Sequence, residues 1–169
     1  MFSETTSWLD KIGDTQEEIN DRLIELWEAN KDKSRGTISI EILTAIAKYD
    51  KTPASILEEI LDGQYPEKIM TLAIRNSNTP MESARTFLHS PKCGYRSTEY
   101  LLAFSSVPIE DFIDIANSDL PVASTLRSSL LSGLHTDRIE EMKKFLGMPD
   151  NASLPIPWMR KILGWDEDE

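Results

Sequence analysis

Apolar residues recur at helical spacing along most of this sequence, and the first clear case lies near its beginning. One face of the pattern consists of Ile19, Leu23, Leu26 and Trp27. Residues spaced three and four apart share a face of an α-helix, and Thr15 and Glu18 precede them with the spacing of a capping box. The opposite face is acidic and carries Glu17, Asp21, Glu25 and Glu28. We therefore expect a helix that begins after Thr15, with a short helical segment around Trp8–Ile12 before it.

From about Ser39 onward the apolar pattern breaks into short helical segments, punctuated by proline or by another helix-start signal. At Thr52-Pro53 we expect threonine to be the N-cap and proline the first helical residue, where its missing N–H costs nothing. The later signals are Pro66, Thr79-Pro80, Pro108, Pro121 and Thr136-Asp137. No segment alternates long enough to indicate a strand. The pattern predicts an all-α protein.

Part of the chain repeats itself. Ile42–Leu61 aligns with Ile69–Leu88 without a gap at a period of 27 residues. The identical pairs are Ile42/Ile69, Thr44/Thr71, Thr52/Thr79, Pro53/Pro80 and Leu61/Leu88. A third unit covers Tyr100–Ala116, with Pro108 placed 28 residues after Pro80, and a weaker fourth unit has Thr136 at a further 28 residues. Repeats of this length are typical of stacked supersecondary units.

Each unit has a helix, a short polar turn and a second helix. Neither helix can bury its apolar stripe alone, so stacked neighbours are expected to form a short helical-repeat solenoid with helical caps at both ends. We assign residues 1–36 to an acidic helical cap and loop, and residues 37–147 to three to four repeats of 27 to 28 residues. Residues 148–169 form a second cap with prolines, tryptophans and an acidic tail. Together these parts are expected to make one globular domain.

The turn of the second repeat resembles a known family. Ala73–Leu88 is similar to the variant leucine-rich repeat of bacterial proteins, and the matching turn residues are Arg75, Asn76, Asn78, Thr79 and Pro80. The resemblance implies a right-handed, all-helical solenoid, akin to HEAT-type stacks, with a general role in macromolecular interaction. One branch of that family carries an iron–sulfur module held by several cysteines, whereas this sequence has only Cys93. The units here are longer than the family's usual ones, so a generic HEAT-like assignment stays open.

The net charge of −11 narrows the choice of partners. A strongly acidic chain repels nucleic-acid phosphates and anionic lipid, so we expect neither direct nucleic-acid binding nor membrane binding. A single cysteine fits a reducing compartment. The N-terminal segment lacks the basic and apolar regions of a signal peptide, and no apolar stretch reaches the ~18–20 residues that span a bilayer. The expected location is the cytoplasm.

Sets of residues that indicate catalysis are weak. His89 and Cys93 stand four residues apart with Pro91 between them, which disfavours a shared helix face for a nucleophile pair. Zinc and EF-hand spacings are missing, and the seven glycines occur singly rather than in a phosphate-binding loop. We expect no catalytic, cofactor or metal site and no enzymatic activity. An enzyme with an unrecognised site is the third-ranked hypothesis.

Three groups of residues are candidates for partner binding. The acidic face formed by Glu17, Asp21, Glu25 and Glu28 either solubilises a helix or recognises a basic partner, and residues 1–30 hold eight acidic and two basic side chains. Arg75, Arg96 and Arg127 lie near repeat turns or helix ends, where they either contact an acidic partner or stabilise helix C-termini. Trp158 and Trp165 either cap the core or anchor a partner, including a second copy of this chain.

The leading functional hypothesis is a non-enzymatic protein-interaction module: an adaptor, immunity protein or inhibitor that binds a protein partner through its repeat surface. The alternative is an acidic nucleic-acid mimic that blocks a nucleic-acid-binding protein with rows of carboxylates. Charge pattern rather than pocket shape would then carry recognition, so binding would fall steeply with salt.

Overall fold

The computed structural model describes residues 8–33, 36–132, 134, 136–149, 152–153 and 156–165. Across these ranges the regular elements are α-helices and 3₁₀ helices, without a strand. The expected all-α class is therefore confirmed for the described residues. Internal contacts divide the chain into two compact units, Met1–Phe87 and Leu88–Glu169, which we call the N-terminal unit and the C-terminal unit.

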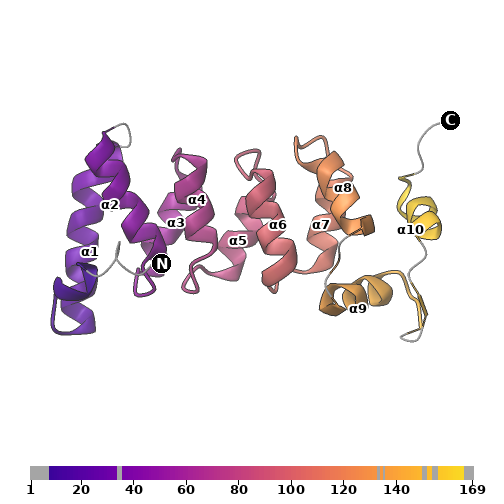
Figure 1. Ribbon diagram of the computed structural model, residues 1–169, viewed down its shortest axis with the longest axis horizontal. Helices are drawn as coiled ribbons and strands as arrows, with labels where there is room; N and C mark the ends of the chain where they lie inside the picture. The colour runs from indigo at the N-terminus through magenta and orange to yellow at the C-terminus, as the bar shows by residue number, and fades with distance from the viewer. Residues whose placement is uncertain are drawn as a thin grey trace. The chain divides into compact units, whose positions relative to one another are not determined.

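The N-terminal unit is built from paired helices. Its elements are η1 (Leu9–Lys11), α1 (Gln16–Asn30), η2 (Lys31–Lys33), α2 (Thr37–Lys48), α3 (Ala54–Asp62), α4 (Glu67–Ile74) and most of α5 (Met81–Leu88). Helix α2 packs against both α1 and α4, and α3 packs against α4 (Figure 1). The most deeply buried side chains in this unit include Leu23, Trp27, Leu43, Ile46, Leu57, Ile60 and Ile69.

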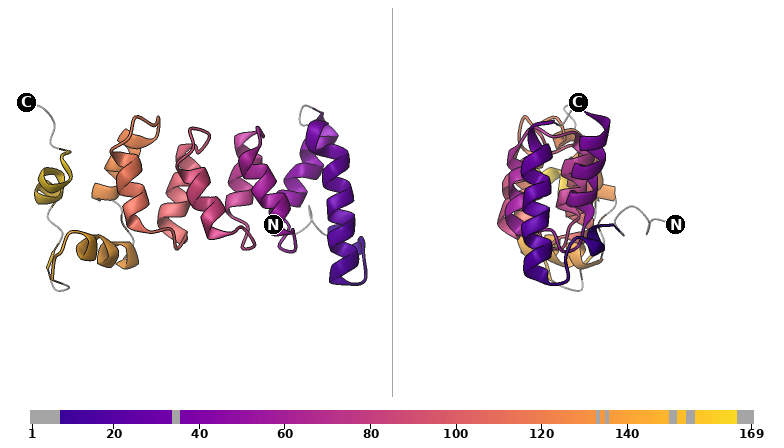
Figure 2. Two further views of the ribbon diagram at one scale, coloured as in Figure 1. Left: turned by 180° about the vertical axis from the view of Figure 1, so that it is seen from behind. Right: turned by 90° about the vertical axis from the view of Figure 1, so that its left-hand side faces the viewer.

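The C-terminal unit is organised around α8. Its elements are α6 (Tyr95–Phe104), α7 (Ile109–Ala116), α8 (Ala123–Ser132), α9 (Thr136–Phe145) and α10 (Ile156–Leu163). Helix α8 contacts α6, α7 and α10, while α9 contacts α7. Figure 2 shows the helices of this unit from behind, in pink through orange to yellow. Its buried side chains include Leu101, Ile109, Phe112, Leu126, Leu130 and Met142.

The start of α1 follows the sequence prediction. Thr15 is the N-cap, and its Oγ1 accepts from the Glu18 backbone N–H at 3.2 Å. The Glu18 carboxylate in turn accepts from the backbone N–H of Thr15 at 3.2 Å and of Asp14 at 2.8 Å. The capping box is confirmed. Both hydrogen bonds of a capping box join residues within four positions of chain and pair N–H groups that lack a partner in the helix. The motif can therefore be recognised from the local sequence.

The predicted cap at Thr52-Pro53 is wrong. Pro53 itself is the N-cap of α3, and the buried Thr52 hydroxyl donates at 2.5 Å to the carbonyl of Ile46, in the last turn of α2. Thr79 does the same with the Ala73 carbonyl of α4, also at 2.5 Å. The last four carbonyls of a helix lack partners within that helix. The threonines therefore close the preceding helix instead of opening the next one.

Two asparagines join successive turns in the N-terminal unit. The Asn76 side chain donates to the carbonyls of Ala47 at 3.0 Å and Tyr49 at 2.7 Å. The Asn78 side chain donates to the carbonyls of Asp50 at 2.7 Å and Thr52 at 3.1 Å. The Asn76 amide oxygen also accepts from the Asn78 backbone N–H at 3.0 Å. The turn before α5 thus satisfies backbone carbonyls of the turn before α3.

In the C-terminal unit a single arginine side chain donates to the backbone carbonyls of a helix end and a turn. Arg138, on α9, is 4% exposed and has its guanidinium 5.4 Å from the centre of the Phe112 ring. It donates to the carbonyls of Leu101 at 3.2 Å, Leu102 at 2.8 Å, Ser105 at 2.5 Å and Val107 at 2.6 Å. It also pairs with the Glu141 carboxylate at 2.7 Å. One side chain therefore satisfies the end of α6 and the turn that leads to α7.

Candidate interaction surface

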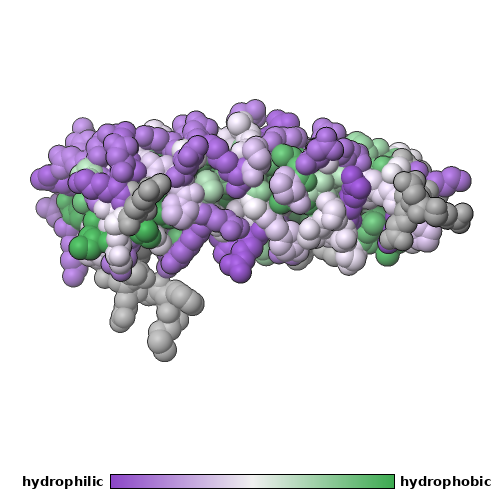
Figure 3. Space-filling model, turned by 90° about the horizontal axis from the view of Figure 1, so that it is seen from above, coloured by the Kyte–Doolittle hydropathy of each residue, from purple (hydrophilic) through white to green (hydrophobic). Residues whose placement is uncertain are grey.

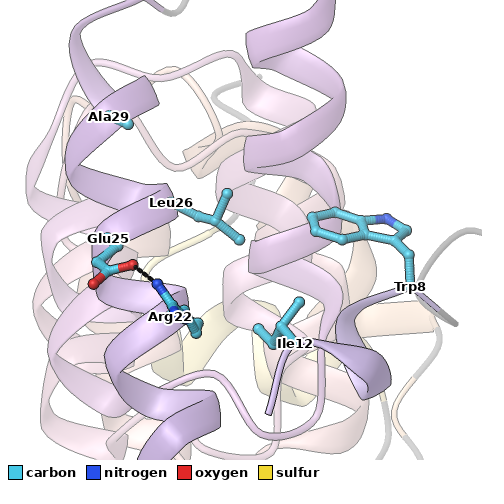
Figure 4. Close-up of a pocket in the computed structure, with 6 residues that line it drawn as sticks. All are labelled: Trp8, Ile12, Arg22, Glu25, Leu26 and Ala29. Carbon is cyan, nitrogen blue, oxygen red and sulfur yellow. Dashed lines mark hydrogen bonds and ion pairs between the residues drawn. The ribbon is translucent and has the colours of Figure 1, made fainter.

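An open pocket of about 410 Å³ lies between η1 and the outer side of α1. Its lining residues are Trp8, Ile12, Arg22, Glu25, Leu26 and Ala29. Figure 4 shows the Trp8 ring directed toward Leu26, with Ile12 beside them and the Arg22–Glu25 ion pair at the edge. The pocket thus combines an apolar floor with a charged rim.

The pocket exists because α1 has more apolar surface than its neighbours cover. Ile19, Leu23 and Trp27 are buried. Leu26 lies next to this stripe and remains partly exposed. Trp8 is 39% exposed, which is high for a tryptophan. The four-residue apolar face expected from the sequence therefore divides into three core residues and one pocket residue.

The η1 side of the pocket is fixed by burial and by hydrogen bonding. Leu9 is fully buried, and it holds the segment that presents Trp8 and Ile12. The Tyr49 hydroxyl, at the end of α2, donates to the Asp10 carboxylate at 2.9 Å. Lys51 adds a longer contact, with its Nζ 3.9 Å from Asp10. The pocket wall is thereby tied to α2.

The hydrogen bond from Tyr49 to Asp10 should make the stability of the N-terminal unit fall at alkaline pH. Burial, and then the hydrogen bond to Asp10, raise the pKa of Tyr49 from 10.0 to about 12. The neutral phenol is favoured in the folded chain, so its stabilising contribution is complete below about pH 10 and is lost as the pH rises toward about 12. We expect the urea unfolding midpoint of Tyr49→Phe to fall less steeply with pH than that of the wild type between about pH 10 and about pH 12. Tyr100→Phe is the control. Equal slopes in wild type and Tyr49→Phe would contradict the assignment.

The charged rim of the pocket consists of Arg22 and Glu25. Arg22 donates to Glu25 at 2.7 Å, and both side chains are more than half exposed. Hydrogen bonding and charge from Glu25 raise the pKa of Arg22, with smaller effects of the same sign from Glu18 and Asp21. The charges that act on this guanidinium are therefore predominantly negative. Figure 3 shows the hydrophilic surface at the α1–α2 end of the N-terminal unit, with apolar patches between the polar side chains.

All four acidic residues predicted on α1 are exposed, but their surroundings differ. Glu25 pairs with Arg22, and Glu28 pairs with Lys31 at 2.8 Å. Within the described residues Glu17 and Asp21 form no ion pair. Half of the predicted acidic face is thus locally neutralised, and half is available to an external cation.

A second network fixes α1 on α3. The Trp27 indole N–H donates to Glu59 at 2.6 Å, and Lys31 contacts the other oxygen of that carboxylate at 3.0 Å. Burial alone would raise the pKa of Glu59, but the hydrogen bonds from Trp27 and Lys31 outweigh it and lower that pKa. The Tyr65 ring lies against Trp27 at 5.4 Å between centroids. This network holds the helix that carries the pocket, and no local pattern in the sequence indicated it.

Two of the three predicted arginines lie at helix ends, and the third contacts the end of a neighbouring helix. Arg75 is the C-cap residue of α4, and Arg96 lies exposed in the first turn of α6. The Arg127 Nε donates at 2.5 Å to the carbonyl of Ala116, the last residue of α7. This contact matches the helix-terminus interpretation for Arg127. Partner binding by Arg75 and Arg96 stays a prediction.

Trp165 is packed within the C-terminal unit. It is 7% exposed, and its indole N–H donates to the Asn117 side chain at 2.6 Å. This geometry favours a capping role over an exposed anchor. Trp158 belongs to α10, but its side chain lies outside the described residues, as does the acidic tail Asp166–Glu169.

The candidate catalytic residues have structural neighbours. His89 Nε2 lies 2.9 Å from the Asp111 carboxylate, and the buried Cys93 Sγ lies 3.4 Å from the Thr98 hydroxyl. Among the described residues, no cluster of three histidine, cysteine or acidic side chains could hold a metal ion. None of the helices in that part of the chain combines the length and apolar character needed to span a membrane.

No protein-family model, curated protein or solved structure matches this chain. The resemblance to the variant leucine-rich repeat stays a prediction carried by the turn residues.

Proposed function

We propose that this chain is a non-enzymatic protein-interaction module of the adaptor, immunity-protein or inhibitor type, acting in the cytoplasm. The observation that carries the proposal is the repetition of one turn: Thr52 and Thr79 close successive helices in the same way, 27 residues apart. Repeated units of this kind stack into extended surfaces that bind macromolecules. On this view residues 37–147 form a short right-handed solenoid, capped by residues 1–36 and 148–169.

The use of buried polar groups supports this proposal. Thr52, Asn76 and Arg138 are all buried and all donate to backbone carbonyls. Such contacts stabilise turns and helix ends, so these buried side chains serve the fold. The surface left for recognition is then the exposed one, including the pocket beside α1.

The nucleic-acid mimic is less well supported. A mimic needs an uninterrupted row of carboxylates, because charge pattern carries its recognition. The ion pairs of Glu25 with Arg22 and of Glu28 with Lys31 interrupt the row on α1. Shape together with charge therefore accounts better for this surface than charge alone.

The proposal is tested by affinity capture of the tagged full-length chain from its native lysate, with and without nuclease, at low and high salt. An adaptor or inhibitor should retain one defined protein in every condition. A nucleic-acid-binding protein released by salt would favour the mimic. Retention of the untagged chain itself would identify a homodimer, and retention of nothing in any condition would contradict the proposal.

A further inference from the structure

We infer that the pocket between η1 and α1 docks a basic amphipathic helix of a protein partner. One large apolar side chain of that helix enters the pocket, and its lysines or arginines face the carboxylates of α1. The inference rests on the proposed function, which it deepens by stating the chemistry of the partner. It commits to the outer side of α1 as the surface used.

The pocket has the size and lining of an anchor site. Its volume of about 410 Å³ falls within the range of about 300–1,000 Å³ that is usual for ligand pockets. Trp8, Ile12, Leu26 and Ala29 supply four of its six lining side chains. An exposed tryptophan beside a leucine is the kind of contact in which a single buried side chain contributes much of the binding energy. The pocket should therefore prefer a leucine, phenylalanine or similar side chain.

The charge around the pocket selects a basic partner. Residues 8–33 contain eight acidic and four basic side chains, a net charge of −4. The charged side chains that line the pocket are Arg22 and Glu25, and the carboxylates of Glu18 and Asp21 add negative charge near Arg22 from outside the lining. Complementary charge steers association and excludes like-charged partners, so an acidic helix or a nucleic acid is disfavoured here.

The spacing of the carboxylates indicates a helical partner. Asp21, Glu25 and Glu28 follow one another at intervals of four and three residues, which places them along one side of α1. In the part of the chain that the structure describes, Asp21 forms no ion pair, whereas a basic partner has to displace Arg22 from Glu25 and Lys31 from Glu28. At 1.5 Å per residue these three carboxylates span about 10 Å. A partner helix that lies along α1 carries lysines at the same spacing and an apolar residue beside them, as in helix-in-groove recognition.

Arg22 is the one rim residue that opposes such a partner. Its ion pair with Glu25 is exposed on both sides, and exposed ion pairs contribute little to stability. The guanidinium can therefore be displaced at small cost, after which Glu25 faces the incoming cation. Removing the charge of Arg22 should strengthen the docking, whereas removing a charge outside the pocket should not.

The probe is a synthetic peptide with leucines on one helical face and lysines on the other. Two controls keep its length: a scrambled sequence of the same composition, and a version with glutamate in place of lysine. Affinity for the full-length protein is measured by calorimetry. We expect the amphipathic lysine peptide to bind at least about tenfold more tightly than the scrambled one, and the glutamate peptide not to bind. Equal affinities for the lysine peptide and its scramble would overturn the inference.

Matched variants locate the binding. Trp8→Ser and Leu26→Ser should each weaken peptide binding about tenfold, as truncation of an anchor contact does. The control is Ile38→Ser, because Ile38 is 74% exposed on α2 and lies outside the pocket. Circular dichroism checks that each variant is folded. If either pocket variant unfolds, amide chemical shifts of the wild-type protein, followed during the titration, provide the location instead.

Removal of the positive charge of Arg22 is expected to raise the affinity for the lysine peptide. Arg22→Gln should tighten binding of the lysine peptide about threefold or more, while Lys68→Gln, an equal change of charge at an exposed site on α4, should have less effect. Weaker binding by Arg22→Gln would overturn the inference, as would unchanged binding by both pocket variants. A protein captured from lysate equally well by Trp8→Ser would leave the proposed function intact and refute this docking mode. Dimerisation of wild type that Trp8→Ser abolishes would assign the pocket to a second copy instead.

Discussion

Replacement of Arg138 by methionine is expected to destabilise the C-terminal unit by about 3–5 kcal/mol, because several buried backbone carbonyls lose a hydrogen-bond donor at once. Methionine fills a similar volume but donates no hydrogen bond, so the carbonyls of Leu102, Ser105 and Val107 lose this donor together. The Leu101 carbonyl also loses it but keeps the N–H and hydroxyl of Ser105 as donors. Each buried polar group left without a partner costs about 1–3 kcal/mol. Urea unfolding, followed by hydrogen exchange in peptides of each unit, measures the effect where it occurs.

Lysine should not rescue this position. An ammonium group is compact and cannot spread its donors over four carbonyls and the Glu141 carboxylate, as the planar guanidinium does. Arg96→Met is the matched control, because Arg96 is exposed on α6 of the same unit. A change below about 1 kcal/mol for Arg138→Met, similar to that of ordinary surface substitutions, would show that these contacts carry little of the stability.

The second large effect is expected at Asn76, where substitution by alanine should destabilise the N-terminal unit by about 2–4 kcal/mol. The change removes both donors to Ala47 and Tyr49 and the acceptor for the Asn78 backbone N–H. Because Asn76 is buried, water does not readily replace these bonds. Chemical denaturation of the full-length chain measures the loss.

Asn20→Ala is the control for Asn76→Ala, since Asn20 makes one exposed hydrogen bond, with Gln16 on α1. A double mutant with Asn78→Ala tests whether the two asparagines act together. We expect the double substitution to cost less than the sum of the single ones, because both residues satisfy the same preceding turn. Strict additivity would indicate two independent contacts.

The features that the sequence predicted correctly are those decided within a few residues. The capping box of Thr15 and Glu18 is one such feature, because donor and acceptor are three residues apart. The exposed acidic side of α1 is another, because helical spacing alone assigns it. The all-α class follows from many local signals of this kind.

The features that it missed depend on contacts between distant residues. Thr52 looked like an N-cap because threonine before proline favours that position, but in the folded turn its hydroxyl donates to the carbonyl of Ile46, which also accepts from the Tyr49 N–H. Asn76 was recognised as a turn residue, yet its acceptors lie 27 and 29 residues earlier. Arg138 stands among charged residues in a segment that reads as a solvent-exposed helix, although it is buried.

The candidate site also combines features that the local sequence predicts with features that depend on distant residues. Helical spacing placed Glu25 and Leu26 on different faces of α1, but both line one pocket once Trp8 and Ile12 approach from η1. That approach depends on the contact between Tyr49 and Asp10, which are 39 residues apart. No local pattern encodes a meeting of this kind, so the acidic residues were identified and the pocket was not.

Because Cys93 is buried, the reactivity of its thiol reports on openings of the C-terminal unit. Its thiol is the sole one in the sequence and is 3% exposed. A thiol-specific reagent can reach it only when the surrounding segment opens, so the labelling rate, compared with that of a small free thiol, yields the opening free energy. The wild-type chain can therefore report its own transient openings under native conditions, without an introduced label.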